Sequence, residues 1–135
     1  EYLIIDELSL RLREPVRGEI VVFRYPRDPS QYFIKRVVGL PGETIEVTGG
    51  NVMVYNTEHP NGLVLEEAYL EESTTGKVRV TLGDDEYYVF GDNRDSSLDS
   101  RSFGSVHTDN IIGRVWVRGL PFSRIGTFDL PSYNL

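Results

Sequence analysis

Glycine and proline interrupt this chain so often that little room remains for a long helix. They account for 13 and 7 of its 135 residues, and both are unfavourable inside helices and typical of turns. The runs between them are short and rich in β-branched and aromatic side chains, which favour strands. The pattern therefore predicts an all-β or nearly all-β fold, with strands at Tyr2 to Ile5, Glu19 to Arg24, Gln31 to Val38, Thr44 to Val47, Asn51 to Tyr55, Lys77 to Leu82, Glu86 to Phe90 and Ile112 to Arg118.

Length, charge and cysteine content exclude several classes of function. A chain of 135 residues that is 39% apolar can bury one core but not two independent ones. Its formal charge of −7 has the wrong sign for a nucleic-acid-binding protein. The absence of cysteine excludes disulfides, thiolate metal sites and cysteine nucleophiles. No apolar run approaches the roughly 18 residues that cross a bilayer, and no metal site or cofactor is predicted.

The middle of the chain predicts a β-ribbon followed by a loop. The turn signal Gly49-Gly50-Asn51 lies between two alternating runs, so residues 44–55 are expected to form a hairpin. The stretch Leu63 to Thr75 has some helical spacing, but its β-branched residues favour strand and loop. Four glutamates of the segment Asn56 to Lys77 are predicted to form a solvated face: Glu66, Glu67, Glu71 and Glu72.

Lys35 is unusual because it lies inside an apolar strand. Strand alternation places it on one face with Phe33 and Val37, and places Ile34 and Arg36 on the other. Burial between two large apolar residues would penalise the ammonium form and lower the pKa of Lys35 toward neutrality, which suits a general base. The alternative is that the side chain extends its amine to solvent from a half-buried strand.

The segment Phe90 to Arg101 contains almost nothing apolar after its first residue. An EF-hand that starts at Asp95 would place Ser100 where glycine is needed and Val106 where the bidentate glutamate belongs, so that calcium site is excluded. A structural interpretation is a network of Asx turns in which Asp99 pairs with Arg101. A functional interpretation remains equally open at this point.

Other catalytic templates do not fit. The chain has no nucleophile elbow, no Ser-x-x-Lys, no Walker loop and no His-Glu-x-x-His motif. A Ser-His-Asp triad would need His59 or His107, and both lie among turn residues. These two histidines are predicted to be surface or turn residues.

Three segments form a specific ordered pattern. They are Arg17-Gly18-Glu19-Ile20-Val21-Val22-Phe23, Ile34-Lys35-Arg36-Val37-Val38-Gly39-Leu40-Pro41-Gly42-Glu43 and Gly91-Asp92-Asn93-Arg94-Asp95-Ser96-Ser97-Leu98-Asp99-Ser100-Arg101. The pattern continues with Gly104 and Ile112-Gly113-Arg114. It closely resembles the motifs of type I signal peptidases, and the resemblance extends from residue 1 to about residue 126.

The resemblance implies a membrane-anchored serine endopeptidase that removes signal peptides with a Ser/Lys dyad. Lys35 matches the general base of the family, and Ser97 matches the serine that orients the lysine. The resemblance further implies that Asp99 and Arg101 brace the loop. The other polar residues of the motifs are expected to be structural at the site: Arg36, Asp92, Asn93 and Arg94.

The same resemblance implies the substrate and the cellular location. Val22, Phe33 and Ile34 fall where the family lines shallow pockets for small side chains near the cleavage site. The expected partners are preprotein signal peptides and a lipid surface, with no nucleic acid. The expected location is the extracytoplasmic face of the plasma membrane.

The nucleophile of the family belongs to a Ser-Met-x-Pro-Thr motif that precedes a strand like Glu1-Tyr2-Leu3-Ile4-Ile5. The chain is therefore expected to begin just past its nucleophile, and to be inactive by itself, with the membrane anchor also upstream. Ser9 does not match this motif.

The expected fold is a signal-peptidase-like coiled β-sheet or barrel with a small β-ribbon excursion. Residues 1–135 are expected to form one extracytoplasmic peptidase domain, with a core at about 1–55 and 77–126 and an excursion at about 44–80. One alternative is a self-cleaving repressor-type peptidase that also uses a Ser/Lys dyad. Another is a non-catalytic β-barrel that binds peptides and leaves Lys35 an ordinary exposed lysine.

Overall fold

The computed structural model describes residues 2–6, 14–67, 70, 73–95 and 97–118. The strands are Tyr2–Asp6 (β1), Ile20–Tyr25 (β2), Asp28–Gly39 (β3), Thr44–Thr48 (β4), Asn51–Tyr55 (β5), Leu63–Val64 (β6), Val78–Thr81 (β7), Glu86–Phe90 (β8), Val106–His107 (β9) and Ile111–Arg118 (β10). A short helix covers Ser100–Phe103 (α2), and a 3-10 turn covers Thr108–Asn110 (η1). The all-β prediction is confirmed, and every strand predicted from the sequence is present.

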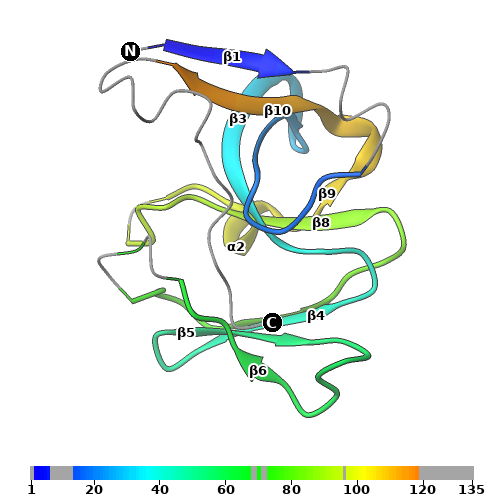
Figure 1. The fold of residues 1–135 in the computed structure, drawn as a ribbon, viewed down its shortest axis with the longest axis vertical. Coiled ribbons are helices and arrows are strands. Elements are labelled where there is room, and N and C mark those ends of the chain that lie inside the picture. The colour runs from blue at the N-terminus through cyan, green and yellow to red at the C-terminus, as the bar shows by residue number, and fades with distance from the viewer. Residues whose placement is uncertain (1, 7–13, 68–69, 71–72, 96, 119–135) are drawn as a thin grey trace.

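The strands form two antiparallel sheets, one above the other in Figure 1. The larger sheet has six strands in the order β1-β10-β2-β3-β8-β9, and the smaller has four in the order β6-β5-β4-β7. The predicted hairpin is β4–β5, whose Gly49 and Gly50 both have positive φ angles, as a tight turn requires. The segment after it is strand and loop where it is described, and its strand β6 pairs with β5.

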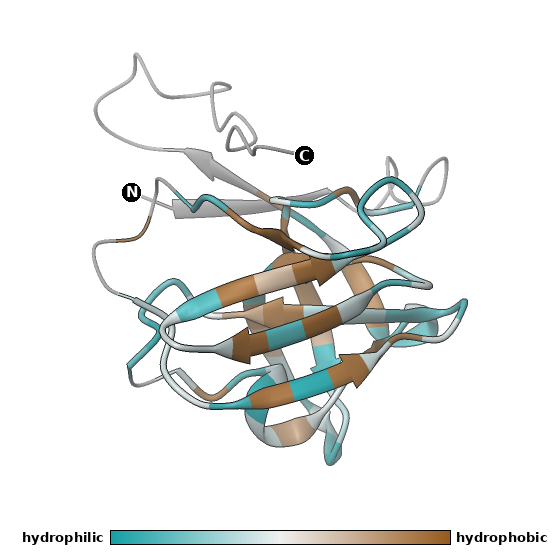
Figure 2. Ribbon diagram, turned by 90° about the horizontal axis from the view of Figure 1, so that it is seen from below, coloured by the Kyte–Doolittle hydropathy of each residue, from teal (hydrophilic) through white to brown (hydrophobic). Residues whose placement is uncertain are grey.

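Each sheet has its own apolar cluster. Inward and outward positions alternate along β4 and β5, and Figure 2 shows the matching alternation of brown and teal on the four-stranded sheet. The buried members of the cluster on this sheet are Val38, Ile45, Val47, Val52, Val54, Leu65, Leu82, Tyr88 and Phe90. Those of the larger sheet are Val21, Phe23, Val37, Tyr87, Val89, Phe103 and Val106.

Strand β8 contributes to both clusters. Tyr87 and Val89 belong to the cluster of the larger sheet, while Tyr88 and Phe90 belong to that of the smaller one. Its four residues from Tyr87 to Phe90 are all buried, as expected for a strand covered on both faces. The loop that follows β8 therefore leaves from a strand that is fixed on both sides.

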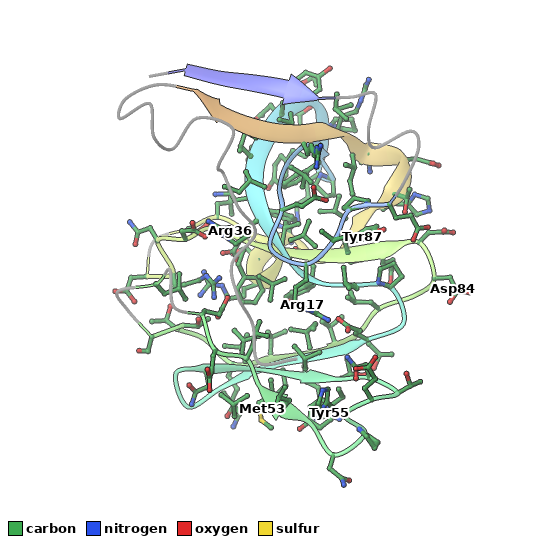
Figure 3. All side chains as sticks on the ribbon, viewed as in Figure 1. Arg17, Arg36, Met53, Tyr55, Asp84 and Tyr87 are labelled. Atoms are coloured by element: carbon green, nitrogen blue, oxygen red, sulfur yellow. The ribbon has the colours of Figure 1, made fainter. Side chains whose placement is uncertain are left out.

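A charged group also joins the two layers. Arg17 donates to both carboxylate oxygens of Glu43, at 2.8 and 2.7 Å, and to the carbonyl of Val38. In Figure 3 it lies between the two sheets. Burial alone would raise the pKa of Glu43, but the hydrogen bonds from Arg17, Asn56 and the Leu40 N–H hold that pKa below its ordinary value.

Candidate active site

Strand β3 fixes the position of Lys35. Lys35 pairs with Val21 of β2, and Phe33 pairs with Phe23. Val21, Phe23 and Val37 share the cluster of the larger sheet, and Phe33 packs against it. Lys35 therefore lies on the face predicted from strand alternation, and it is half-buried there.

The loop between β8 and α2 brings Ser97 to this lysine. Lys35 Nζ donates a hydrogen bond of 3.1 Å to Ser97 Oγ, although the two residues are 62 positions apart. The amine of Lys35 thus contacts a hydroxyl of the polar loop, which is the loop between β8 and α2. The fold brings together the two side chains that the resemblance implies act as a pair.

Gly91, the first residue after β8, makes room for this contact. A Cβ atom built on Gly91 would lie 2.6 Å from Ser97 Cβ and 3.4 Å from Lys35 Nζ, and it would overlap Ser97 Oγ. A contact of that kind forces the neighbouring side chain to move. Only a residue without a side chain allows Ser97 and Lys35 to meet at this place.

Asp99 and Arg101 form the pair predicted for this loop. Arg101 Nε and Nη2 donate to the two oxygens of Asp99 at 2.9 and 2.7 Å. Asp99 is the N-cap of α2 and is fully buried, and it also accepts the N–H of Gly91 at 3.1 Å. Burial would raise the pKa of Asp99, but the hydrogen bonds from Arg101 and Gly91 hold it below its ordinary value. The pairing of Asp99 with Arg101 that their spacing predicts is present in the structure.

Arg36, the neighbour of Lys35 in the second motif, also holds the loop. Arg36 Nε and Nη2 donate to Asp92 at 2.9 and 2.7 Å, and its Nη1 donates to the carbonyl of Gly18. Its side chain points toward the loop that follows β8 (Figure 3). Asn93, next in the loop, is exposed. Arg36 and Asp92 thus connect β3 with the start of this loop.

Arg94 is nearly inaccessible, at 1% exposure, and its main partner is Glu67. The two side chains form a bidentate pair with distances of 2.9 and 2.7 Å. The predicted solvated face is therefore wrong for Glu67, because a buried guanidinium needs a carboxylate that is buried with it. Glu66 is exposed as predicted, while Glu71 and Glu72 lie outside the described residues.

The residues expected to line the substrate pockets lie on neighbouring strands. Val22 pairs with Ile34 across β2 and β3; Val22 is buried and Ile34 is 45% exposed. Phe33 lies on the opposite face, stacked on Tyr25 at 4.5 Å and packed edge-on against Phe103. Ile34 is therefore the most exposed member of this set.

The two histidines weighed in the sequence analysis, His59 and His107, lie at turns and neither is buried. His107 is half-exposed and caps η1, where its Nδ1 accepts the N–H of Asp109 at 3.1 Å. The prediction of a surface or turn residue is confirmed for His107. Among the residues that the structure describes, no three histidine or carboxylate side chains gather as a metal site would require.

The Glu67–Arg94 pair is the part of the site that sequence reasoning missed. A single charged residue in an acidic stretch gives no sign of its distant partner. A weak signal was present, because Leu65 and Thr74 could place part of this segment against the core, and both are buried.

Comparisons with known proteins identify the family of this chain. The profile of the signal peptidase (peptidase S26) family matches residues 1–119. The chain belongs to the peptidase S26 family. The polar loop, Lys35 and Gly91 described above all lie inside the matched region of this S26 domain.

Curated relatives give the same result. The S26 domain is 44% identical over 133 residues to a probable signal peptidase I-2 of Synechocystis, a match that covers 92% of this chain and 57% of that protein. It is 41% identical to a signal peptidase I of Leptolyngbya laminosa, with 96% of this chain and 64% of that protein covered. The chain thus spans less than two thirds of the length of either relative.

A solved structure supports the fold assignment. The S26 domain is similar to the crystal structure of a signal peptidase I from Enterococcus faecalis, with a TM-score of 0.64 and 32% identity. The match covers 76% of this chain and 97% of that one. The predicted signal-peptidase-like fold is therefore confirmed.

Proposed function

We propose that this domain is the peptidase unit of a type I signal peptidase, a serine endopeptidase that removes signal peptides from preproteins. Family membership supports the class of reaction. The observation that supports the mechanism most directly is the 3.1 Å contact between Lys35 Nζ and Ser97 Oγ. In this proposal residues 1–135 form one extracytoplasmic peptidase domain.

Lys35 acts as the general base. Its amine, once unprotonated, accepts the proton of the nucleophilic serine hydroxyl, which in this proposal belongs to a motif like Ser-Met-x-Pro-Thr, while that oxygen attacks the scissile carbonyl. The lysine then returns the proton to the leaving amine as the carbon–nitrogen bond breaks. Water hydrolyses the resulting ester with Lys35 as base again. Ser97 holds the Lys35 side chain in one rotamer throughout. This positioning role keeps Nζ oriented before the reaction begins.

An extended peptide is the substrate that the sheet fits best. β8 pairs with β3 from Arg36 onward, so the edge of β3 at Phe33 to Lys35 extends beyond the end of β8. A peptide that adds to this edge gains backbone hydrogen bonds next to the lysine. In the proposal, its small side chains contact Ile34 on the surface, with the buried Val22 packed beside Ile34 on β2, and Phe33 supports the strand from the other face.

The proposed location is the extracytoplasmic face of the plasma membrane, in contact with lipid. Three apolar side chains near the site are strongly exposed, namely Tyr32, Ile34 and Leu98. Surfaces of this kind mark interaction sites. Within the described part of the chain, no helix has the length and apolarity to cross a bilayer.

A cleavage assay with a signal-sequence peptide tests the proposal. It compares this chain, a version extended with its natural upstream sequence, and the extended version with Lys35→Ala. The chain has two lysines, and the exposed Lys77 provides the matched control Lys77→Ala. Cleavage by the extended protein and by Lys77→Ala, with loss in Lys35→Ala, would support the assignment. Cleavage that persists in Lys35→Ala would refute the base, and no cleavage by any form would favour a peptide-binding module.

A further inference from the structure

The segment between β5 and β7 contacts the polar loop at several points, and these contacts are not explained by the resemblance. Glu67 Oε1 and Oε2 accept from Arg94 at 2.9 and 2.7 Å, and Thr74 Oγ1 accepts from Arg94 Nη1 at 2.9 Å. Thr75 donates its hydroxyl to the carbonyl of Arg94 and accepts Arg101 Nη1 at its own carbonyl. The segment therefore holds Arg94 of the loop and Arg101 of α2.

Arg94 connects this segment to Gly91, the residue next to Lys35 and Ser97. Its Nε donates to the carbonyl of Gly91 at 2.7 Å, while its guanidinium lies 4.6 Å from the ring centre of Phe90. Gly91 is the residue whose missing side chain lets Ser97 and Lys35 meet. A continuous set of contacts thus joins Glu67 to the Lys35–Ser97 pair.

The burial of this ion pair makes the connection stiff. The Arg94 side chain is 0% exposed and that of Glu67 is 6% exposed. Bidentate pairing fixes the plane of a guanidinium as well as its position. Without the carboxylate, the buried cation would lack a compensating charge and would have to shift or admit water. Either change moves the Nε that holds the carbonyl of Gly91.

We propose that Glu67 is a positioning residue of the peptidase site, which acts through Arg94 and Gly91 on the contact between Lys35 and Ser97. This inference rests on the proposed function. It assigns a role in the reaction to a segment whose glutamates would otherwise count as surface charge.

The test measures kcat and KM of the upstream-extended protein on a signal-sequence peptide. Glu67→Gln keeps the shape of the side chain and removes its charge. It should lower kcat at least tenfold and change KM less than threefold, because the proposed role of Glu67 is to position Lys35 and Ser97 and not to bind the peptide. The matched control is Glu66→Gln at the exposed neighbouring residue, which should keep both constants within twofold of wild type.

Two further variants separate positioning from folding. Thr74→Val removes only the hydroxyl contact to Arg94 and should lower kcat about threefold in a protein that remains folded by near-ultraviolet circular dichroism. A double-mutant cycle with Arg94→Met should show that Glu67→Gln has no further effect on kcat once Arg94 is gone. A merely structural role would lower the folded fraction and leave kcat per folded molecule unchanged.

The outcomes distinguish this inference from the proposed function. If the extended wild type does not cleave the peptide, the proposed function fails. If it cleaves and depends on Lys35, while Glu67→Gln and Thr74→Val both retain wild-type kcat per folded molecule, only the positioning role of Glu67 is refuted. Additive effects of Glu67→Gln and Arg94→Met would also refute it.

Discussion

The four-stranded sheet is held by apolar side chains, whereas the loop between β8 and α2 is held by charged ones. In the sheet, Ile45 and Val54 are fully buried among other aliphatic and aromatic groups. In the loop, the buried groups include Arg94 and Asp99, each with an oppositely charged partner. Apolar packing is nondirectional and tolerates small shifts, while bidentate charge pairs fix orientation. The comparison indicates that the sheet contributes most of the stability, while the loop fixes the positions of the side chains at the site.

The largest expected effect on stability lies in the sheet. Ile45→Ala empties space inside a fully buried cluster and should lower the free energy of unfolding by about 3 kcal/mol. Urea denaturation of this chain measures it, with Val64→Ala on the exposed side of β6 as the control. An unchanged urea midpoint in Ile45→Ala would contradict the conclusion that apolar packing in the four-stranded sheet stabilises the fold.

The largest expected effect on activity lies in the loop. Gly91→Ala would place a methyl group against Ser97, 3.4 Å from Lys35 Nζ. A displacement of about 1 Å at a catalytic group costs about 100-fold in rate, so kcat of the upstream-extended protein should fall by about that factor. A variant that retains wild-type kcat would show that the Lys35–Ser97 contact is not needed.

The same substitution in the apolar region should have a different result. A Cβ on Gly39 would lie 2.7 Å from Ile45 Cγ1 and 2.9 Å from Tyr88 Cβ. Gly39→Ala should therefore cost about 2 kcal/mol of stability through overpacking. Its kcat per folded molecule should stay within about twofold of wild type. A hundredfold loss of kcat per folded molecule in Gly39→Ala would show that the apolar sheet also positions the side chains of the site.

The charged groups should make stability depend on acid pH. Hydrogen bonds from Arg101 and Gly91 hold the pKa of Asp99 below its ordinary value of 3.8. Ionised Asp99 therefore stabilises the fold at pH values above 3.8, and this stabilisation is lost as the pH falls through the lower folded pKa. Thermal unfolding between pH 6 and pH 2, at about one-unit steps, measures the loss. Asp99→Asn should show a flatter profile, and an identical slope would exclude Asp99 as its source.

The smallest effect is expected for a charge pair on the outer face of the four-stranded sheet. Arg79 and Glu46 lie 3.3 Å apart, and the Arg79 side chain is 56% exposed. Exposed pairs of this kind contribute about 0 to 1 kcal/mol. Glu46→Gln should therefore shift the urea midpoint very little. A loss as large as that of Ile45→Ala would show that charge also stabilises this sheet.

Much of the fold follows from local patterns in the sequence. Alternation along Thr44 to Tyr55 and the turn at Gly49 and Gly50 are local properties, so the hairpin could be predicted. Strands β6 and β9 have two residues each, too few for a recognisable period. Helix α2 was also missed, because its four residues depend on the cap at Asp99.

In the candidate site, too, contacts between residues close in sequence could be predicted, and contacts between distant residues could not. Asp99 and Arg101 are two residues apart, so their pairing could be predicted from spacing. Lys35 and Ser97 are 62 residues apart, and only resemblance to a family joined them. Glu67 and Arg94 are 27 residues apart, and neither spacing nor resemblance related them, because long-range partners are set by how the sheets stack.

Strand β8 gives the molecule a particular sensitivity to insertions and deletions. Its side chains point alternately to the two apolar clusters, so a slip of one residue would exchange Tyr87 and Val89 with Tyr88 and Phe90. The same slip would carry Gly91 away from Lys35, since the glycine follows the last residue of the strand. Pairing errors in β8 would thus disrupt the candidate site and both apolar clusters together, so a misaligned chain would be an unfolded one rather than a stable protein with a distorted site.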